Sequence, residues 1–209
     1  MKIFERRMEE RILHKAQELF FRYGLKAITM DEVAKELGMS KKTLYEHFKN
    51  KNEIIIKVTE AYLTHQNIEH QNCTQNAKDA VEELILLMGS LHRIFDNFDV
   101  RIINEMQRYY PDAWNIWLEF KENTIMKDIK DNLTKGIKQG LFRQNINIDI
   151  IARMRLEQIQ LAMDTRYFPS DMYNLAEVNA QLLEQYINGL CTENGHQLKQ
   201  KYIDKLNSY

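Results

Sequence analysis

Proline, glycine and cysteine are scarce in this chain, which has 2 Pro, 7 Gly and 2 Cys among 209 residues. Because proline and glycine both weaken helices, their scarcity favours long helices over sheets and turns. Two cysteines cannot build a disulfide framework, and Cys73 and Cys191 lack the spacing of a metal-binding motif. We expect both to be reduced structural residues, with a redox-sensing pair as the alternative.

Long hydrophobic runs are also absent. No stretch approaches the roughly 20 uncharged apolar residues of a membrane span. Arg6, Arg7 and several glutamates stand where a signal peptide would be apolar. We therefore expect a cytoplasmic protein without a membrane partner. The chain is long enough for one or two domains with a proper core.

Catalytic motifs are missing as well. The sequence contains no glycine-rich phosphate loop, no HExxH and no GxSxG. The acidic pairs, Glu9 with Glu10 and Glu82 with Glu83, fall in charge-rich helical segments and are expected to face solvent. We expect a protein that is not an enzyme and has no cofactor or metal.

Positive charge is concentrated at the N-terminus. The net charge of the chain is −1, yet residues 1 to 51 contain 12 Lys and Arg against 8 Asp and Glu, and the rest contains 17 against 22. A basic N-terminal region suits a protein that uses phosphate contacts for affinity but does not coat nucleic acid non-specifically. The small surplus favours a dimer that binds two half-sites.

Residues 29 to 48 predict two short helices joined by a tight turn. Thr29 followed by Glu32 is a capping box, which starts a helix at Met30. Gly38 supplies the left-handed conformation that ends it. Ser40 caps the next helix, whose Leu44 and Phe48 point inward.

The outer face of that second helix is basic, hydroxylated and aromatic. It carries Lys41, Lys42, Thr43, Tyr45, Glu46 and His47. A third helix start follows at Asn50, and Lys51 lies in its first turn, where free N–H groups can hold a phosphate. The pattern indicates a helix-turn-helix for DNA.

These residues also carry a family resemblance. The matching positions are Gly24, Thr29, the run VAKELGMS, Thr-Leu-Tyr at 43 to 45, His-Phe at 47 and 48, and Lys-Asn-Glu at 51 to 53. Over about residues 8 to 55 the chain resembles the TetR family of bacterial transcriptional regulators. Lys42 departs from the family pattern, which often has a small residue there, and is expected to add a base or phosphate contact. The alternative is a helix-turn-helix that serves only as a packing scaffold.

The expected DNA-binding residues are Thr29, Ser40, Lys41, Lys42, Thr43, Tyr45, His47 and Lys51. Lysine fits guanine acceptors and threonine can contact a base, so we expect Lys41, Lys42, Thr43 and His47 near base edges or the adjoining backbone. The resemblance implies phosphate contacts for Thr29, Tyr45, His47 and Lys51. Arg6, Arg7 and Arg11, near the start of the first helix, are expected to form a solvated basic face, and the alternative is that they reach a flanking phosphate or the minor groove.

We expect an all-α fold of about nine to ten helices. A three-helix DNA-binding domain at 1–50 would precede a helical regulatory and dimerisation domain at 51–209. The expected helices cover about 5–22, the two of the helix-turn-helix, 51–70, 77–97, 99–108, 111–140, 150–167, 172–192 and 195–207. A polar break separates the fourth from the fifth at 71–75, and Asp149 is expected to cap the helix that starts at Ile150.

The resemblance implies a homodimer, formed by the helices at about 149–167 and 172–192 in a four-helix bundle. Their apolar stripes are equally compatible with a core inside one chain. One short recognition helix contacts few bases, whereas two helices related by a two-fold axis read successive major grooves. We therefore expect a palindromic double-stranded DNA operator.

Aromatic and polar side chains between residues 92 and 126 suggest a pocket for a small-molecule effector. The candidates are His92, Phe95, Asn104, Gln107, Tyr109, Trp114 and Trp117. Such a set could line a cavity for an apolar or planar ligand whose binding releases the operator, as expected of a repressor. The alternative is a body that docks a protein partner instead of sensing a ligand.

Overall fold

The computed structural model describes residues 2–95 and 99–206, with side chains from Arg7 to Leu91 and from Asp99 to Lys205. Its helices are α1 (Lys2–Tyr23), α2 (Met30–Glu36), α3 (Lys41–His47), α4 (Lys51–Asn76), α5 (Ala80–Phe95), α6 (Arg101–Tyr109), α7 (Pro111–Phe120), the π-helical segment η1 (Lys121–Ile125), α8 (Met126–Lys138), α9 (Ile148–Ala162), α10 (Leu175–Leu190) and α11 (Glu193–Leu206). Because α7, η1 and α8 are continuous, these residues form ten separate helices, and the all-α prediction is confirmed.

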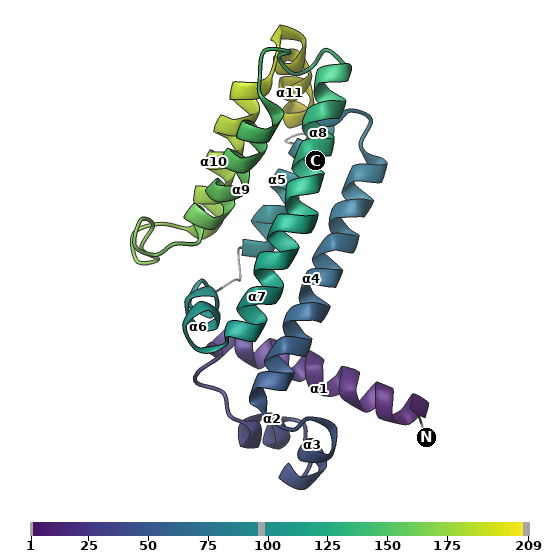
Figure 1. Ribbon diagram of the computed structural model, residues 1–209, viewed down its shortest axis with the longest axis vertical. Coiled ribbons are helices and arrows are strands. Elements are labelled where there is room, and N and C mark those ends of the chain that lie inside the picture. The colour runs from purple at the N-terminus through teal and green to yellow at the C-terminus, as the bar shows by residue number, and fades with distance from the viewer. Residues whose placement is uncertain (1, 96–98, 207–209) are drawn as a thin grey trace. The chain divides into compact units, whose positions relative to one another are not determined.

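The chain divides into two compact units, whose helices are labelled in Figure 1. Unit 1 comprises Met1–Gln66 and Asp99–Glu119, and unit 2 comprises Asn67–Phe98 and Phe120–Tyr209. Both α4 and the continuous helix from α7 to α8 pass from one unit into the other. The predicted boundary after residue 50 separates the DNA-binding domain from the regulatory domain and is a different division from that into these two units. It stays a prediction.

Unit 1 has an apolar interior built from the helical stripes that the sequence predicts. Fully or nearly fully buried side chains come from α1 to α4: Ile12, Ala16, Phe20, Val33, Leu44, Phe48, Ile54, Ile55 and Val58. The ring of Phe21 meets Tyr62 edge-on, with ring centres 5.1 Å apart. Burial raises the pKa of Tyr62 to about 12. This packing fixes the short helices α2 and α3 on longer ones.

Two expected helix boundaries are wrong. The polar residues 71–75 do not break the chain, because α4 continues to Asn76 and Thr74 Oγ1 donates to the His70 carbonyl within the same helix at 3.0 Å. Asn147, not Asp149, caps α9, since its Oδ1 accepts from the amide of Ile150 at 3.1 Å. Asp149 lies in the first turn and pairs with Lys130 at 2.6 Å.

Unit 2 packs α5, α8, α9, α10 and α11 around a second apolar core. Its buried members are Ala80, Val81, Leu84, Ile85, Leu133, Leu141, Phe142, Ala152, Leu183, Ile187, Leu190 and Cys191. Phe142 is fully buried against Gly136, where an added Cβ would lie 2.0 Å from its ring. Glu83 is also buried and pairs with Lys135 at 3.1 Å, so the expectation that it faces solvent is wrong.

Both thiols are free, and both belong to unit 2. Cys191 is buried, which raises its thiol pKa to about 11, and Cys73 Sγ lies 3.6 Å from Ser90 Oγ. A buried thiol with a raised pKa is a poor nucleophile. Among the described helices none combines the length and apolar character of a membrane span.

Candidate nucleic-acid interface

The caps that shape the helix-turn-helix are formed as the sequence predicts. The amide of Thr29 donates to Glu32 Oε2 at 2.6 Å, and the amide of Glu32 donates back to Thr29 Oγ1 at 3.2 Å. The amide and the hydroxyl of Thr29 both donate to the Glu32 carboxylate, and these two hydrogen bonds lower its pKa. Ser40 Oγ accepts from the amide of Thr43 at 3.0 Å. The ends of both helices are therefore fixed by local contacts that hold α3 in place.

The turn between the two helices is supported by glycine and by α1. Gly38 has a φ of +66°, a left-handed conformation that favours glycine. Arg11 donates from Nη2 to the carbonyl of Leu37 at 3.1 Å. Arg11 is exposed, as expected of a solvated basic face, and this contact shows that its guanidinium also braces the turn.

The outward face of α3 has the chemistry that the sequence predicts. Lys41, Lys42 and Tyr45 are exposed, and Thr43 and His47 are half-buried. On the opposite side, Leu44 is fully buried and Phe48 nearly so. The helix is therefore anchored by its apolar side and offers ammonium, hydroxyl, phenol and imidazole groups on the other.

Lys41 already has a carboxylate partner. Its Nζ lies 2.7 Å from Asp31 Oδ1 on α2 and 5.9 Å from the centre of the Tyr45 ring. The hydrogen bond from Lys41 to Asp31 raises the pKa of Lys41. Both partners of this ion pair are well exposed, so the contact is weak and a DNA phosphate can compete with it.

Lys51, the first residue of α4, is half-buried and turned toward the loop after α1. Its Nζ donates to the carbonyl of Lys26 at 3.4 Å and lies 5.8 Å from the centre of the Tyr110 ring. Burial lowers its pKa. Asn50 caps α4 by accepting from the amide of Glu53 at 3.0 Å.

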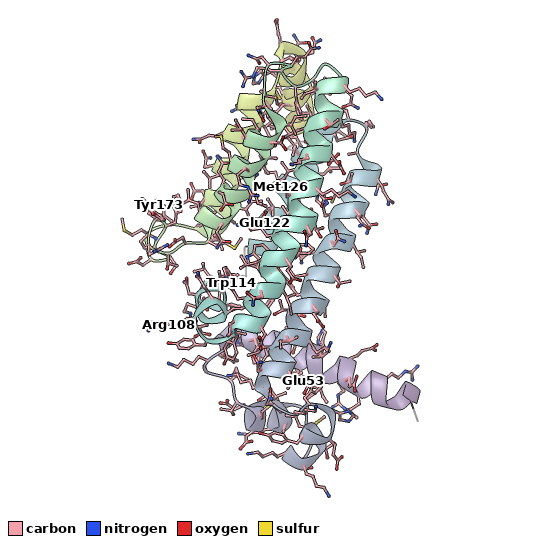
Figure 2. The ribbon with its side chains drawn as sticks, viewed as in Figure 1. Glu53, Arg108, Trp114, Glu122, Met126 and Tyr173 are labelled. Carbon is pink, nitrogen blue, oxygen red and sulfur yellow. The ribbon has the colours of Figure 1, made fainter. Side chains whose placement is uncertain are left out.

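The carboxylate of Glu53, in the first turn of α4, occupies one of the nearby backbone N–H groups. Glu53 Oε2 accepts from the amide of Lys49 at 2.7 Å, and Figure 2 marks this residue. Because Glu53 places negative charge near the N-terminus of α4, a phosphate would be attracted there mainly by Lys51.

A glutamate of α6 holds the loop between α1 and α2. Gly24 ends α1 with a φ of +87°, and the amide of Lys26 donates to Glu105 Oε2 at 2.9 Å. On the neighbouring surface, Asn52 Nδ2 donates to Asp112 Oδ2 at 3.1 Å. The DNA-binding elements are thus fixed by α6 and the start of α7, which come much later in the sequence.

The arrangement of caps, turn and exposed basic helix agrees with a family match. Residues 12–58 match the model described as bacterial regulatory proteins, tetR family. The chain belongs to the TetR family. It is a DNA-binding transcriptional regulator, and the relatives described next are transcriptional regulators as well.

Similar proteins cover most of this TetR-family chain. The HTH-type transcriptional regulator YvaF of Bacillus subtilis is 25% identical over 193 residues, which make up 89% of this chain and 97% of YvaF. The solved ketosteroid transcriptional regulator KstR2 of Mycobacterium tuberculosis is 22% identical, with a TM-score of 0.60, over 89% of this chain and 96% of its own. FadR of Bacillus subtilis, solved in complex with stearoyl-CoA, is 19% identical, with a TM-score of 0.64, over 87% and 98%. These structures share the fold.

The expected effector residues fall in different parts of the TetR-family chain. Asn104, Gln107 and Tyr109 lie on the exposed side of α6, and Trp114 and Trp117 are half-buried on α7. All five belong to unit 1. His92 and Phe95 belong to α5, but their side chains lie outside the described residues. The seven residues remain a prediction.

Three residues of this regulator contribute to the interface without a clear local signal. Asp31 pairs with Lys41, Arg11 supports the turn, and Glu105 holds the loop after α1. Arginine and carboxylates are common on helix surfaces, so composition alone does not distinguish these from solvated charges. Their partners become apparent only from the packing of separate helices.

Proposed function

We propose that this regulator is a dimeric repressor that binds a palindromic operator through α3 and is released by a small molecule bound in its C-terminal region. The observation that carries the proposal is the two-sided character of α3. Leu44 is 0% exposed, whereas Tyr45 next to it is 44% exposed. A short helix anchored in this way can enter a major groove with its polar face toward the bases.

Each residue of the predicted DNA-binding set has a proposed role. Lys42 and Thr43 face base edges or the nearby backbone. Lys41 does the same once its ion pair with Asp31 is replaced by a contact with DNA. Tyr45 and His47 contact phosphates, which set the position of the helix without reading sequence. Thr29 and Ser40 fix the ends of α2 and α3 and present their hydroxyl groups at the same surface, and Lys51 contacts phosphate at the start of α4.

The proposed dimer forms through α9 and α10, which pack against one another in unit 2 (Figure 1). One side of α9 carries three exposed apolar residues at helical spacing, namely Ile150, Met154 and Leu161 at 59%, 54% and 37% exposure. A shallow hollow of about 500 Å³ lies along the same helix, between Met154 and Asp164. An apolar stripe of this kind supports pairing with a second copy.

The proposed effector is supported by the relatives rather than by a bound molecule. FadR binds stearoyl-CoA, so its fold admits a ligand with a long apolar chain. Such a ligand would favour a dimer whose two α3 helices are wrongly spaced for successive grooves. A coupling of about 1 to 3 kcal/mol would lower operator affinity some 5- to 150-fold.

The test is equilibrium binding of the full chain to its own upstream intergenic DNA and to random duplex of equal length, across a range of salt concentrations. We expect a strong preference for the upstream DNA and a steep loss of affinity with salt. Equal weak binding to both duplexes would contradict the proposal and indicate that the helix-turn-helix is a packing scaffold.

A further inference from the structure

Arg155 of α9 has a buried guanidinium without a counterion among the described residues. The residue is 3% exposed, and within the described part of the chain neither Nη1 nor Nη2 has a hydrogen-bond partner. The guanidinium lies over the ring of Tyr186 on α10, whose centre is 5.6 Å from the guanidinium carbon. Burial lowers the pKa of Arg155 to about 10, so the side chain is still charged at neutral pH.

The other buried charged side chains of unit 2 are paired. Glu83 lies 3.1 Å from Lys135 Nζ, Lys121 lies 3.4 Å from Glu157, and Lys199 lies 2.9 Å from Glu184. Among the described side chains of unit 2, Arg155 is therefore the buried charged residue that has no charged partner. An isolated buried charge costs several kcal/mol, so a protein that keeps one usually supplies a partner.

Two ion pairs join α9 to the continuous helix formed by η1 and α8. Glu122 of η1 accepts from Arg153 of α9 at 2.7 Å. About two helical turns after Glu122, Lys130 of α8 donates to Asp149 of α9 at 2.6 Å. Met126 lies between Glu122 and Lys130 along this helix, and Figure 2 shows Glu122 and Met126 on the helix beside α9. Arg153 and Asp149 therefore lie on the side of α9 that faces η1 and α8, whereas the guanidinium of Arg155 lies beside Tyr186 of α10.

Several apolar side chains that pack against the core of unit 2 are only half-buried. Met88, Leu91, Met126 and Ile129 pack against the core but keep part of their surface, whereas Val81 and Leu133 on the same helices are fully buried. Methionine side chains adapt their shape readily to a guest. A second polar group, Gln158 Oε1, is also buried and unpaired one turn after Arg155.

We propose that Arg155 binds the anionic group of an amphiphilic ligand whose apolar chain packs against the half-buried methionine and leucine side chains of unit 2. The proposal rests on the sensor role proposed above and names the chemical class of its effector. A carboxylate or phosphate oxygen fits the guanidinium because the planar fork donates two parallel hydrogen bonds to such a group.

Two sources share this chemistry, a free fatty acid and an acyl thioester of a phosphorylated carrier. The test uses isothermal titration of the full chain with laurate, with lauroyl-CoA, with 1-dodecanol as the uncharged analogue, and with coenzyme A alone. The variants are Arg155→Met, which removes the charge at similar volume, and Arg155→Lys, which keeps it. Arg153→Met is the matched control, because it removes an exposed arginine two residues away on the same helix.

We expect the wild-type chain to bind laurate or lauroyl-CoA at least tenfold more tightly than 1-dodecanol. Arg155→Met should lose at least tenfold in affinity for the anionic probe and nothing for 1-dodecanol, Arg155→Lys should lose less, and Arg153→Met should match wild type. Preference for laurate identifies a carboxylate, and preference for lauroyl-CoA over both laurate and coenzyme A identifies the thioester.

Several outcomes would overturn the proposal. They are equal binding of the charged and uncharged probes, undiminished binding by Arg155→Met, and failure of wild type to bind either anionic probe. A fourth is that Arg155→Met weakens dimerisation but not ligand binding, which would assign the counterion to a carboxylate of a second copy. Operator affinity measured without any probe tests DNA binding separately, so a failed ligand site and a failed regulator are distinguishable.

Discussion

The backbone amide of Lys26 donates a 2.9 Å hydrogen bond to the carboxylate of Glu105. The carbonyl of the same residue accepts from Lys51 Nζ at 3.4 Å. Lys26 is thus held on one side by α6 and on the other by the first residue of α4. Since α4 starts directly after the recognition helix α3, this pair of contacts links α6 to the position of the DNA-binding surface.

Removing the α6 contact should weaken both the fold and operator binding. Glu105→Ala leaves the Lys26 amide without its partner, which should lower the free energy of unfolding by about 1 to 2 kcal/mol. The measurement is urea denaturation of the variant beside Glu119→Ala, which removes an exposed glutamate of α7. Equal stability of the two variants would contradict a bracing role for Glu105.

Lys42 should contribute to DNA affinity as one contact of the recognition face. We expect Lys42→Ala to weaken operator binding about tenfold and, if the contact is to phosphate, to reduce the salt slope by about 1. The matched control is Lys57→Ala, because Lys57 is an exposed lysine that pairs with Glu60 on α4. If both variants lose the same affinity, the effect is one of net charge and Lys42 is not in the interface.

The sequence predicted the helix-turn-helix closely because its determinants are local. Thr29 with Glu32, Ser40 with Thr43, and the left-handed Gly38 all act within one helical turn. Cap residues and glycines have few alternative uses at such spacing. The inward positions of Leu44 and Phe48 followed from the same short-range pattern.

The parts that the sequence could not predict depend on distant partners. Lys26 and Glu105 are 79 residues apart, and no periodicity or cap connects them. The polar end of α4 looked like a break, yet it is stabilised by contacts such as His70 with Asp128 at 3.2 Å. The uncompensated charge of Arg155 was also hidden, because an arginine in an amphipathic helix is usually solvated.

Gly136 should tolerate no side chain. An added Cβ would lie 2.0 Å from the buried ring of Phe142, so Gly136→Ala forces a shift in the core of unit 2. We expect a loss of about 1 to 3 kcal/mol in the free energy of unfolding. The control is Gly189→Ala in α10, which meets nothing within 4 Å and should stabilise the helix slightly. Thermal or urea denaturation of both variants tests the difference, and equal stability would contradict the packing.

The His70–Asp128 pair should make stability depend on pH. The hydrogen bond to Asp128 raises the pKa of His70 above its usual 6.5. The stabilisation is therefore fully present below that value and is lost as the pH rises through the raised native pKa. Glu83 acts in the same direction.

Asp128→Asn should accordingly destabilise the protein by about 1 kcal/mol at about pH 6 and by much less at about pH 9. Urea denaturation at both pH values measures the effect, and Asp131→Asn, at an exposed position on the same helix, is the control. A loss that is independent of pH, or one shared by the control, would show that the charged form of His70 is not stabilised by Asp128.

The central claim is that two copies of α3 read successive major grooves of a palindromic operator. Selection of bound sequences from a random duplex library, with wild type and Tyr45→Ala in parallel, tests this claim whatever the operator sequence is. We expect an enriched inverted repeat whose half-site centres are about one helical turn, or about 34 Å, apart, and weaker enrichment of the same repeat for Tyr45→Ala, because a phosphate contact adds affinity without reading sequence. Absence of an enriched sequence with wild type, or enrichment of a single unrepeated site, would contradict it.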